Sequence, residues 1–477
     1  MTKQKDPSKI GAGQMLAWQS RAISASINVI TIGYLLVYCT NALGMSAALV
    51  GTILMACKLV DGVTNLVAGY IVDNTNTKWG RGRPYEWCIV ALWLTTWLLF
   101  SVPAAATTSI KCVWIVVCYT LAVSVFTTFL NANGTVYMVR AFHNEQVYVK
   151  LSSVGGVLVT ACVIVFNTIL PSFQAKVLNS ASGWSKMIAF IAVPMAVLGI
   201  MRFFFIKEND QVSVAASQRV TLRDVGTLLK TNKFIYILMM VLLVSMCISN
   251  MGVATYYFIY VVGNLGIAGV MSLLAIVVMP TMFLYPKFLK KMTIVQLIQR
   301  FMALYFISAV LSWFAKDNLL FLGIAGIFAG AAALPMSYLN GLLIVDLADY
   351  NEWIGHHRME GTLNSVVGFA QQIGAAFGTF LLGAMLSTSG FNGMAKTQPD
   401  SAILMIRFLY CIVPAIGAAL MILIFRFWKL DKVKPQMQAE LSERRAVVAA
   451  KAESAAVAVA QTTTQMAEEQ DAAESKK

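Results

Sequence analysis

Long runs of apolar residues, separated by short polar segments, follow one another along almost the whole chain. Most runs have about 20 residues or more, the length at which an α-helix rising 1.5 Å per residue crosses roughly 30 Å of hydrocarbon. Membrane β-barrels need alternating strands of about ten residues instead. The pattern predicts an all-α membrane protein with twelve spans, at residues 20–42, 46–72, 87–106, 110–139, 149–171, 184–206, 233–262, 266–286, 297–315, 319–347, 361–387 and 402–428.

The composition supports this interpretation. Only 12% of the 477 residues are charged and 58% are hydrophobic, whereas about 25% of the residues of soluble domains are charged. So few charges cannot cover a water-facing surface of this size, which excludes a soluble enzyme and a disordered chain. The eight cysteines lie in or beside apolar runs without a CxxC pair, so we interpret them as buried hydrophobic residues.

The distribution of positive charge predicts how the chain is oriented. Of the 36 Lys and Arg residues, 29 fall on one side of the predicted topology, six on the other, and Lys58 lies within a span. Positive segments stay in the cytoplasm, so both termini are predicted to be cytoplasmic, in a multi-pass protein of the plasma or inner membrane. The same rule explains the net charge of +14, and the aromatic and basic pattern of a nucleic-acid-binding module is absent.

The longest polar interruption between spans divides the chain into two sets of six helices. We predict an N-terminal bundle at 1–206, a cytoplasmic linker at 207–232, a C-terminal bundle at 233–428 and a flexible cytoplasmic tail at 429–477. Two pseudo-symmetric six-helix halves around a cavity at mid-membrane are a transporter architecture. We expect the protein to function as a monomer in the lipid bilayer.

The second predicted span carries the most informative polar residues. Lys58, Asp61 and Asn65 are spaced by three and four residues, so they share one helix face. Ionisable groups at membrane depth are costly and normally face the interior of a bundle. Asp61 is the only carboxylate well inside a span of the N-terminal half. It could bind a proton or a small hard cation, with Lys58 modulating it, or the two residues could merely neutralise each other.

Two charged segments border predicted cytoplasmic helix ends. Residues 73–87 (DNTNTKWGRGRPYEW) contain Arg81 and Arg83, which suit either a conformational latch or a positive topology anchor. Residues 345–361 (VDLADYNEWIGHHRMEG) contain Asp346, Asp349, Glu352 and Arg358. A charged network there could hold one transport state and break in the other, or it could be a static salt-bridge cluster.

The sequence offers no catalytic or metal-binding motif. A catalytic triad, HExxH and the phosphate-binding loop motif are all absent, and the adjacent His356 and His357 cannot share one helix face. We therefore predict neither an enzyme nor a metal site, and no cofactor beyond a coupling ion.

Three segments together resemble one transporter family. KLVDGVTNLVAGYIVDNTNTKWGRGRP (residues 58–84) resembles the helix 2 and loop signature of the glycoside-pentoside-hexuronide:cation symporters, the melibiose-carrier family of the major facilitator superfamily. VDLADYNEWIGHHRMEG resembles the helix 10–11 signature of that family, and YYFIYVVGN (residues 256–264) its helix 7. The resemblance implies the major facilitator fold and alternating-access transport of a sugar or glycoside together with Na⁺, Li⁺ or H⁺.

The resemblance also implies a cation site. The family places two carboxylates one turn apart on helix 2; Asp61 matches the first, whereas the second position is the amide Asn65. Thr64 and Thr128 match helper positions of that site. The loss of one carboxylate removes a charge that would favour Na⁺ and leaves H⁺ coupling, altered cation use or no coupling open.

The family's sugar site is altered further. Its acid on helix 4 corresponds to Asn131 and its lysine on helix 11 to Gln372, while the acid on helix 1 and the arginine on helix 5 have no counterpart. Amides can still hydrogen-bond hydroxyl groups. Asn28 and Tyr257 are further polar residues within spans that could line a cavity or join helices. A cation-coupled sugar symporter is the main prediction, and an uncoupled uniporter or exchanger of a non-sugar organic solute is the alternative.

Overall fold

The structure, a computed structural model, describes residues 11–444 apart from 75–76, 78–79, 81, 143–144, 208–225, 227–229, 357–359 and 396. Nearly all of the described chain is helical, as the apolar pattern predicts. Several helices change to a short π-helical or 3₁₀ stretch part of the way along, and these stretches carry the label η.

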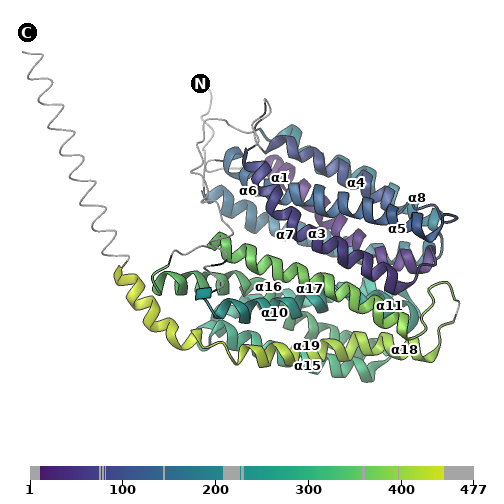
Figure 1. The fold of residues 1–477 in the computed structure, drawn as a ribbon. Helices are drawn as coiled ribbons and strands as arrows, with labels where there is room; N and C mark the ends of the chain where they lie inside the picture. The colour runs from purple at the N-terminus through teal and green to yellow at the C-terminus, as the bar shows by residue number, and fades with distance from the viewer. Residues whose placement is uncertain are drawn as a thin grey trace, which may run out of the picture.

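The first half of the described chain forms one helical bundle (Figure 1). Its elements are α1 (Ala12–Gly33), α2 (Leu35–Val37), η1 (Tyr38–Ala42), α3 (Ala47–Asn74), η2 (Arg83–Trp87), α4 (Cys88–Leu99), α5 (Thr108–Tyr119), η3 (Thr120–Thr127), α6 (Thr128–Ala141), α7 (Glu145–Val177) and α8 (Ala181–Phe205).

The second half forms the other bundle, drawn in teal to yellow-green in Figure 1. Its elements are α10 (Phe234–Ser249), α11 (Val253–Tyr260), α12 (Leu265–Ser272), α13 (Leu274–Val278), η4 (Met279–Leu284), α14 (Tyr285–Leu289), α15 (Ile294–Ala315), α16 (Leu319–Trp353), α17 (Glu360–Thr388), α18 (Asp400–Arg407), η5 (Phe408–Ile412) and α19 (Val413–Phe425).

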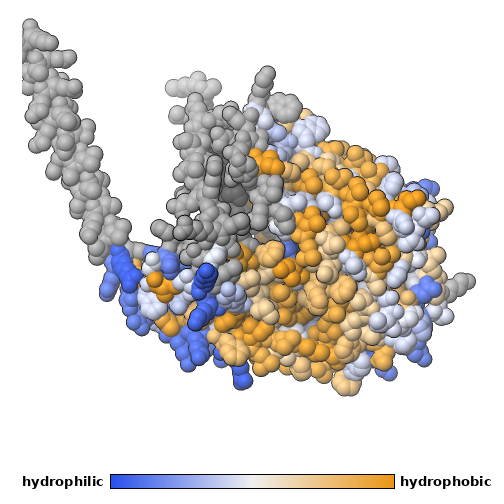
Figure 2. All heavy atoms as spheres, viewed as in Figure 1, coloured by the Kyte–Doolittle hydropathy of each residue, from blue (hydrophilic) through white to orange (hydrophobic). Residues whose placement is uncertain are grey.

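Ten helical stretches of the described residues are long and apolar enough to cross a membrane. The two other predicted spans correspond to α3 and to α4 with the preceding η2. Figure 2 shows hydrophobic side chains over the flank of the bundles and hydrophilic ones towards the two ends. Phe190 is 81% exposed and Phe314 77% exposed, which is the inverse of a soluble surface and is typical of side chains that face lipid.

The two bundles pack on each other through two pairs of helices, α3 with α17 and α7 with α12. Small residues allow the backbones to approach closely. A Cβ atom placed on Gly383 of α17 would clash with the carbonyl oxygen of Ala47 and lie 3.1 Å from the Cα of Gly51. In the second pair, the hydroxyls of Thr168 and Ser272 are 3.0 Å apart.

The bundles are also joined by hydrogen bonds at the end remote from residues 430–444. The hydroxyls of Thr40 and Tyr256 lie 3.0 Å apart, and the Asn41 amide donates to the Tyr260 hydroxyl at 2.6 Å. Thr40 and Asn41 come from η1 and the two tyrosines from α11, so this end of the space between the bundles is closed.

Residues 430–444 form a helix that packs on the C-terminal bundle. Leu430, Met437 and Leu441 are at most 2% exposed. Trp353 at the end of α16 donates to the Glu440 carboxylate at 2.7 Å, and the hydrogen bonds from Gln436 and Trp353 lower the pKa of Glu440. For these residues the structure replaces the expected flexible tail with a docked helix, because its apolar positions recur at helical spacing.

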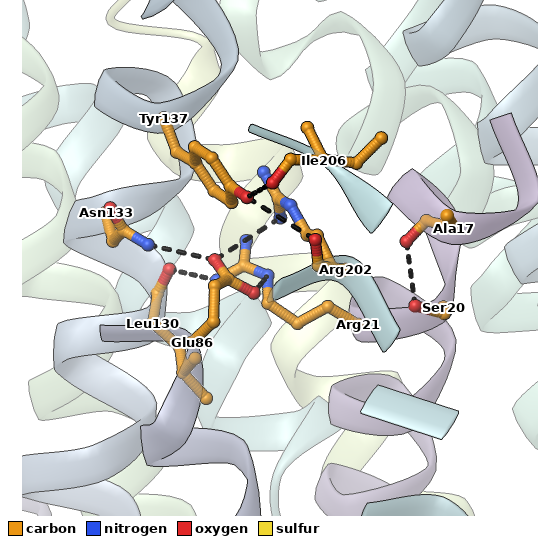
Figure 3. Close-up of polar contacts among 9 residues, drawn as sticks. All are labelled: Ala17, Ser20, Arg21, Glu86, Leu130, Asn133, Tyr137, Arg202 and Ile206. Atoms are coloured by element: carbon orange, nitrogen blue, oxygen red, sulfur yellow. Dashed lines mark hydrogen bonds and ion pairs between the residues drawn. The ribbon is translucent and has the colours of Figure 1, made fainter. Parts of the chain in front are cut away.

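A buried charge cluster ties the helices of the N-terminal bundle together (Figure 3). Glu86 is fully buried, and its carboxylate lies 3.7 Å from Arg21 Nε and 3.9 Å from Arg202 Nη1. Asn133 donates to the same carboxylate at 2.9 Å. The Arg202 guanidinium lies over the Trp18 ring, 3.2 Å from its centroid.

These contacts join four segments of one bundle: α1, η2, α6 and α8. Breaking a buried ion pair by removing one partner is costly because the other charge stays buried without compensation. Here one carboxylate faces two guanidinium groups, so Glu86 is the member whose charge matters most.

We expect Glu86→Gln to destabilise the folded protein by about 3 kcal/mol, because both arginines lose their counter-charge while the side-chain shape is kept. Thermal unfolding of the detergent-purified protein measures the effect. Asp317→Asn, which removes an exposed carboxylate, is the matched control and should leave the melting temperature unchanged. Equal melting of Glu86→Gln and the wild type would contradict this role of Glu86.

Candidate functional site

A cavity of about 470 Å³ lies between the two bundles. Its volume falls within the range of about 300–1,000 Å³ that is typical of small-molecule sites. Six of the residues singled out in the sequence line it: Asn28, Lys58, Asp61, Thr128, Asn131 and Gln372. They come from α1, α3 and α6 of the N-terminal bundle and from α17 of the C-terminal bundle.

Asp61 is held at the boundary between the bundles. Its side chain is only 4% exposed. The Thr128 hydroxyl donates to Asp61 Oδ1 at 3.1 Å, and the Gln372 amide donates to Asp61 Oδ2. Thr128 belongs to the same bundle as Asp61, whereas Gln372 belongs to the other. One carboxylate therefore receives hydrogen bonds from both halves of the protein.

Lys58 lies one turn before Asp61 on α3 and reaches towards α17. Its ammonium group donates to the Thr379 hydroxyl at 2.9 Å and to the Ala375 carbonyl at 3.3 Å. The ion pairs of the described residues do not include one between Lys58 and Asp61. Like Asp61, Lys58 thus forms a polar contact from one bundle to the other.

The other two predicted members of the cation site are placed differently. The Thr64 hydroxyl donates to the backbone carbonyl of Asp61 at 3.0 Å, within its own helix. The side chain of Asn65 lies outside the part of the chain that the structure describes. Thr128 is therefore the predicted helper residue whose hydroxyl reaches the Asp61 carboxylate.

Three of the four predicted substrate-contact residues, Asn28, Asn131 and Gln372, line this cavity, whereas Tyr257 does not. Asn131 is exposed to the cavity. The Asn28 amide nitrogen donates to Thr96 at 2.9 Å, and its buried carbonyl oxygen has no partner within the described part of the chain. Tyr257 does not line this cavity: it is fully buried, donates to the Lys316 carbonyl at 2.5 Å and stacks on Tyr410. The neighbouring Tyr256 lines the cavity instead, because adjacent helical residues face different sides.

The predicted gate residues are only partly described. Asp346 pairs with Lys434 of the docked tail helix at 2.6 Å. Arg83 Nε donates to the Phe203 carbonyl at 2.9 Å, within the N-terminal bundle. Asp349 and Glu352 lie on the last turns of α16, whereas Arg81 and Arg358 lie outside the described residues.

Two partners were missed from the sequence. Thr379 lies two helical turns beyond Gln372 on α17, and this spacing could have identified it. Lys434 lies on the helix whose apolar residues Leu430, Met437 and Leu441 recur at helical spacing, a pattern that would have predicted docking. Groups of three or more His, Cys, Asp or Glu that could hold a metal ion are absent from the described residues.

Comparison with known proteins places the chain in a family. The family described as MFS/sugar transport protein matches residues 22–432. The isoprimeverose transporter of Lactiplantibacillus pentosus is 27% identical over 463 residues, covering 92% of this chain and 94% of that protein. The putative glycoside/cation symporter YagG of Escherichia coli (strain K12) is 24% identical over 422 residues, covering 85% and 88%.

Solved structures have the same fold at low sequence identity. The crystal structure of a D-xylose-proton symporter aligns with a TM-score of 0.59 and 14% identity, covering 86% of this chain and 96% of that one. The nucleoside transporter NupG aligns with a TM-score of 0.60 and 13% identity, covering 86% and 99%. The predicted major facilitator fold is thereby confirmed. Since the family match covers most of the sequence, this integral, multi-pass membrane protein belongs to the MFS/sugar transport protein family.

Proposed function

We propose that the protein is a secondary transporter that carries a sugar or glycoside together with a cation, H⁺ or Na⁺, by alternating access. The observation that carries the proposal is the position of Asp61, a buried carboxylate in the wall of the cavity that is hydrogen-bonded from both bundles. A group at this place can link cation binding to the movement of the bundles. The names of relatives, an isoprimeverose transporter and a putative glycoside/cation symporter, support the same class of substrate and coupling.

The cation acts at Asp61 in this proposal. A proton or Na⁺ that binds the carboxylate offsets its charge, which weakens the hydrogen bond that it accepts from Gln372, since bonds to an ionised group are the stronger ones. Thr128 keeps the carboxylate oriented within the N-terminal bundle. Lys58 modulates the charge balance from its contact with α17. Thr64 and Asn65 stay proposed members of the cation site, as the resemblance of α3 implies.

The substrate occupies the cavity beside Asp61. Asn131 and Asn28 provide amide groups that can hydrogen-bond hydroxyls of a neutral solute. Gln372 lines the same cavity and also donates to Asp61, so it links the substrate to the cation site. An organic cofactor has no part in this cycle, because the cation gradient supplies the driving force.

Access alternates between the two sides of the membrane. The end with the contacts of Thr40 and Asn41 to α11 is closed. We assign this end to the outside, because the docked tail and the predicted positive loops belong to the cytoplasmic side. In the opposite state, we propose that charged residues close the cytoplasmic end: Arg81, Arg83, Asp349, Glu352 and Arg358. Asp346 is held in place by its ion pair with Lys434.

We expect Asp61→Asn to abolish cation-driven accumulation of substrate while exchange of substrate across the membrane continues, because an amide cannot take up H⁺ or Na⁺ as a carboxylate does. Uptake into proteoliposomes with an imposed H⁺ or Na⁺ gradient, with and without an ionophore, measures accumulation. Asp317→Asn removes an exposed carboxylate and is the charge-matched control. Undiminished accumulation by Asp61→Asn would refute the role of Asp61. Uptake by the wild type that no gradient affects would indicate the uncoupled uniporter instead.

We expect Gly383→Ala to slow transport strongly. The added Cβ would clash with the Ala47 carbonyl oxygen, and overpacking of this kind costs about 1–3 kcal/mol, which disfavours the state with the outer end closed. Gly368→Ala on the same helix is the matched control, because nothing lies within 4 Å of its added Cβ. Uptake rates of the two variants, normalised to the amount of folded protein, provide the measurement. Equal rates would show that close packing of α3 and α17 does not limit the cycle.

A further inference from the structure

A second cavity of about 240 Å³ lies in the C-terminal bundle, among α10, α15, α16, α17 and α19. Ser249 lines both this cavity and the larger one beside Asp61. The two cavities therefore adjoin at the end of α10. A solute that fills the first cavity and extends past Ser249 would enter the second.

The α17 helix connects the two spaces as well. Gln372 lines the cavity beside Asp61, whereas the preceding residue, Gln371, lines the second cavity. Two consecutive amides thus face neighbouring cavities, because successive residues of a helix point about 100° apart. Each cavity has its own amide group for a ligand.

The second cavity is hydroxyl-rich and uncharged. Its polar lining comes from three serines, one tyrosine and two amides: Ser245, Ser249, Ser337, Tyr305, Asn340 and Gln371. Of the described residues that line it, none is Asp, Glu, Lys, Arg or His. The remaining lining includes several methionines, such as Met302 and Met336, whose flexible thioethers adapt to irregular apolar surfaces. A ring with hydroxyl groups on its edge and C–H bonds on its faces matches this lining, whereas a carboxylate or phosphate does not.

Asn340 carries an unpaired buried atom in this cavity. Among the described residues, no donor reaches its carbonyl oxygen. Buried polar atoms are nearly always hydrogen-bonded, and exceptions need an explanation. The nearby Ser337 hydroxyl donates to the Ala333 carbonyl at 3.2 Å and keeps its lone pairs for a further donor. One hydroxyl of a bound ligand would satisfy Asn340, and a second hydroxyl could donate to Ser337.

We propose that the cavity around Asn340 and Ser337 is a second subsite that binds the ring attached to the first sugar of a neutral glycoside. The first sugar occupies the cavity beside Asp61, so this inference rests on the proposed function. With this subsite, two-ring glycosides bind more tightly than single sugars. Residues of α16 and α17 then determine which second ring is accepted.

The test compares ligands that differ only in the second ring. Binding of the methyl glycosides of xylose, glucose and galactose, in both anomeric forms, and of the corresponding disaccharides with glucose as the second ring is measured by titration calorimetry on the purified full-length protein. For the sugar that binds, we expect the disaccharide to bind more tightly than the methyl glycoside, because hydroxyls of its second ring donate to Asn340 and Ser337. In Ser337→Leu, which fills the cavity, and in Asn340→Leu, which removes the amide, the affinity for the disaccharide should fall about tenfold. The affinity for the methyl glycoside should stay as in the wild type, which also shows that the variants are folded.

Asn131→Leu in the first cavity is the matched control and should weaken both ligands alike. The second subsite would be overturned if Ser337→Leu and Asn340→Leu lost affinity for both ligands to the same extent, or if neither affinity changed. The proposed sugar transport would stay in place. If the wild type binds none of the glycosides, the proposed function fails and the subsite fails with it.

Discussion

The hydrogen bonds of Asp61 are the constraint on which the rest of the site depends. An ionised carboxylate buried in an apolar bundle needs hydrogen-bond donors. Among the described residues, Thr128 of the N-terminal bundle and Gln372 of the C-terminal bundle both donate to Asp61. The charge of Asp61 and the packing of α3 on α17 therefore cannot change independently. This arrangement gives a physical route from the binding of one cation to the movement of a whole bundle.

The buried ion pairs of the described residues instead stay within one half of the protein. Glu86 and its two arginines belong to the N-terminal half, and the pair of Asp346 with Lys434 belongs to the C-terminal half and its docked tail. Such contacts hold the helices of each half in fixed relation. Lys58 and Asp61 on α3 instead reach α17. The polar contacts thus suit two rigid bodies joined by a few hydrogen bonds that can break.

The surfaces that join the two bodies also suit movement. Small residues such as Gly51 and Gly383 bring the backbones of α3 and α17 together, and the ion pairs of the described residues include none at this contact. The cavities on either side of Ser249 lie next to this interface. A ligand that spans both cavities would touch both bundles, and binding energy would then act on the same interface as the cation.

The sequence by itself determined the helical spans, the division into two halves and the family, because apolar length and the family's motifs are local properties. It also identified Asp61, Thr128, Asn131 and Gln372, which line one cavity. Only the tertiary structure decided which neighbours share a hydrogen bond: Lys58 contacts Thr379 rather than pairing with Asp61, and Tyr256 rather than Tyr257 faces the cavity. These choices depend on how helices far apart in the sequence are rotated against each other, and helix rotation is set by packing across the whole bundle rather than by local sequence.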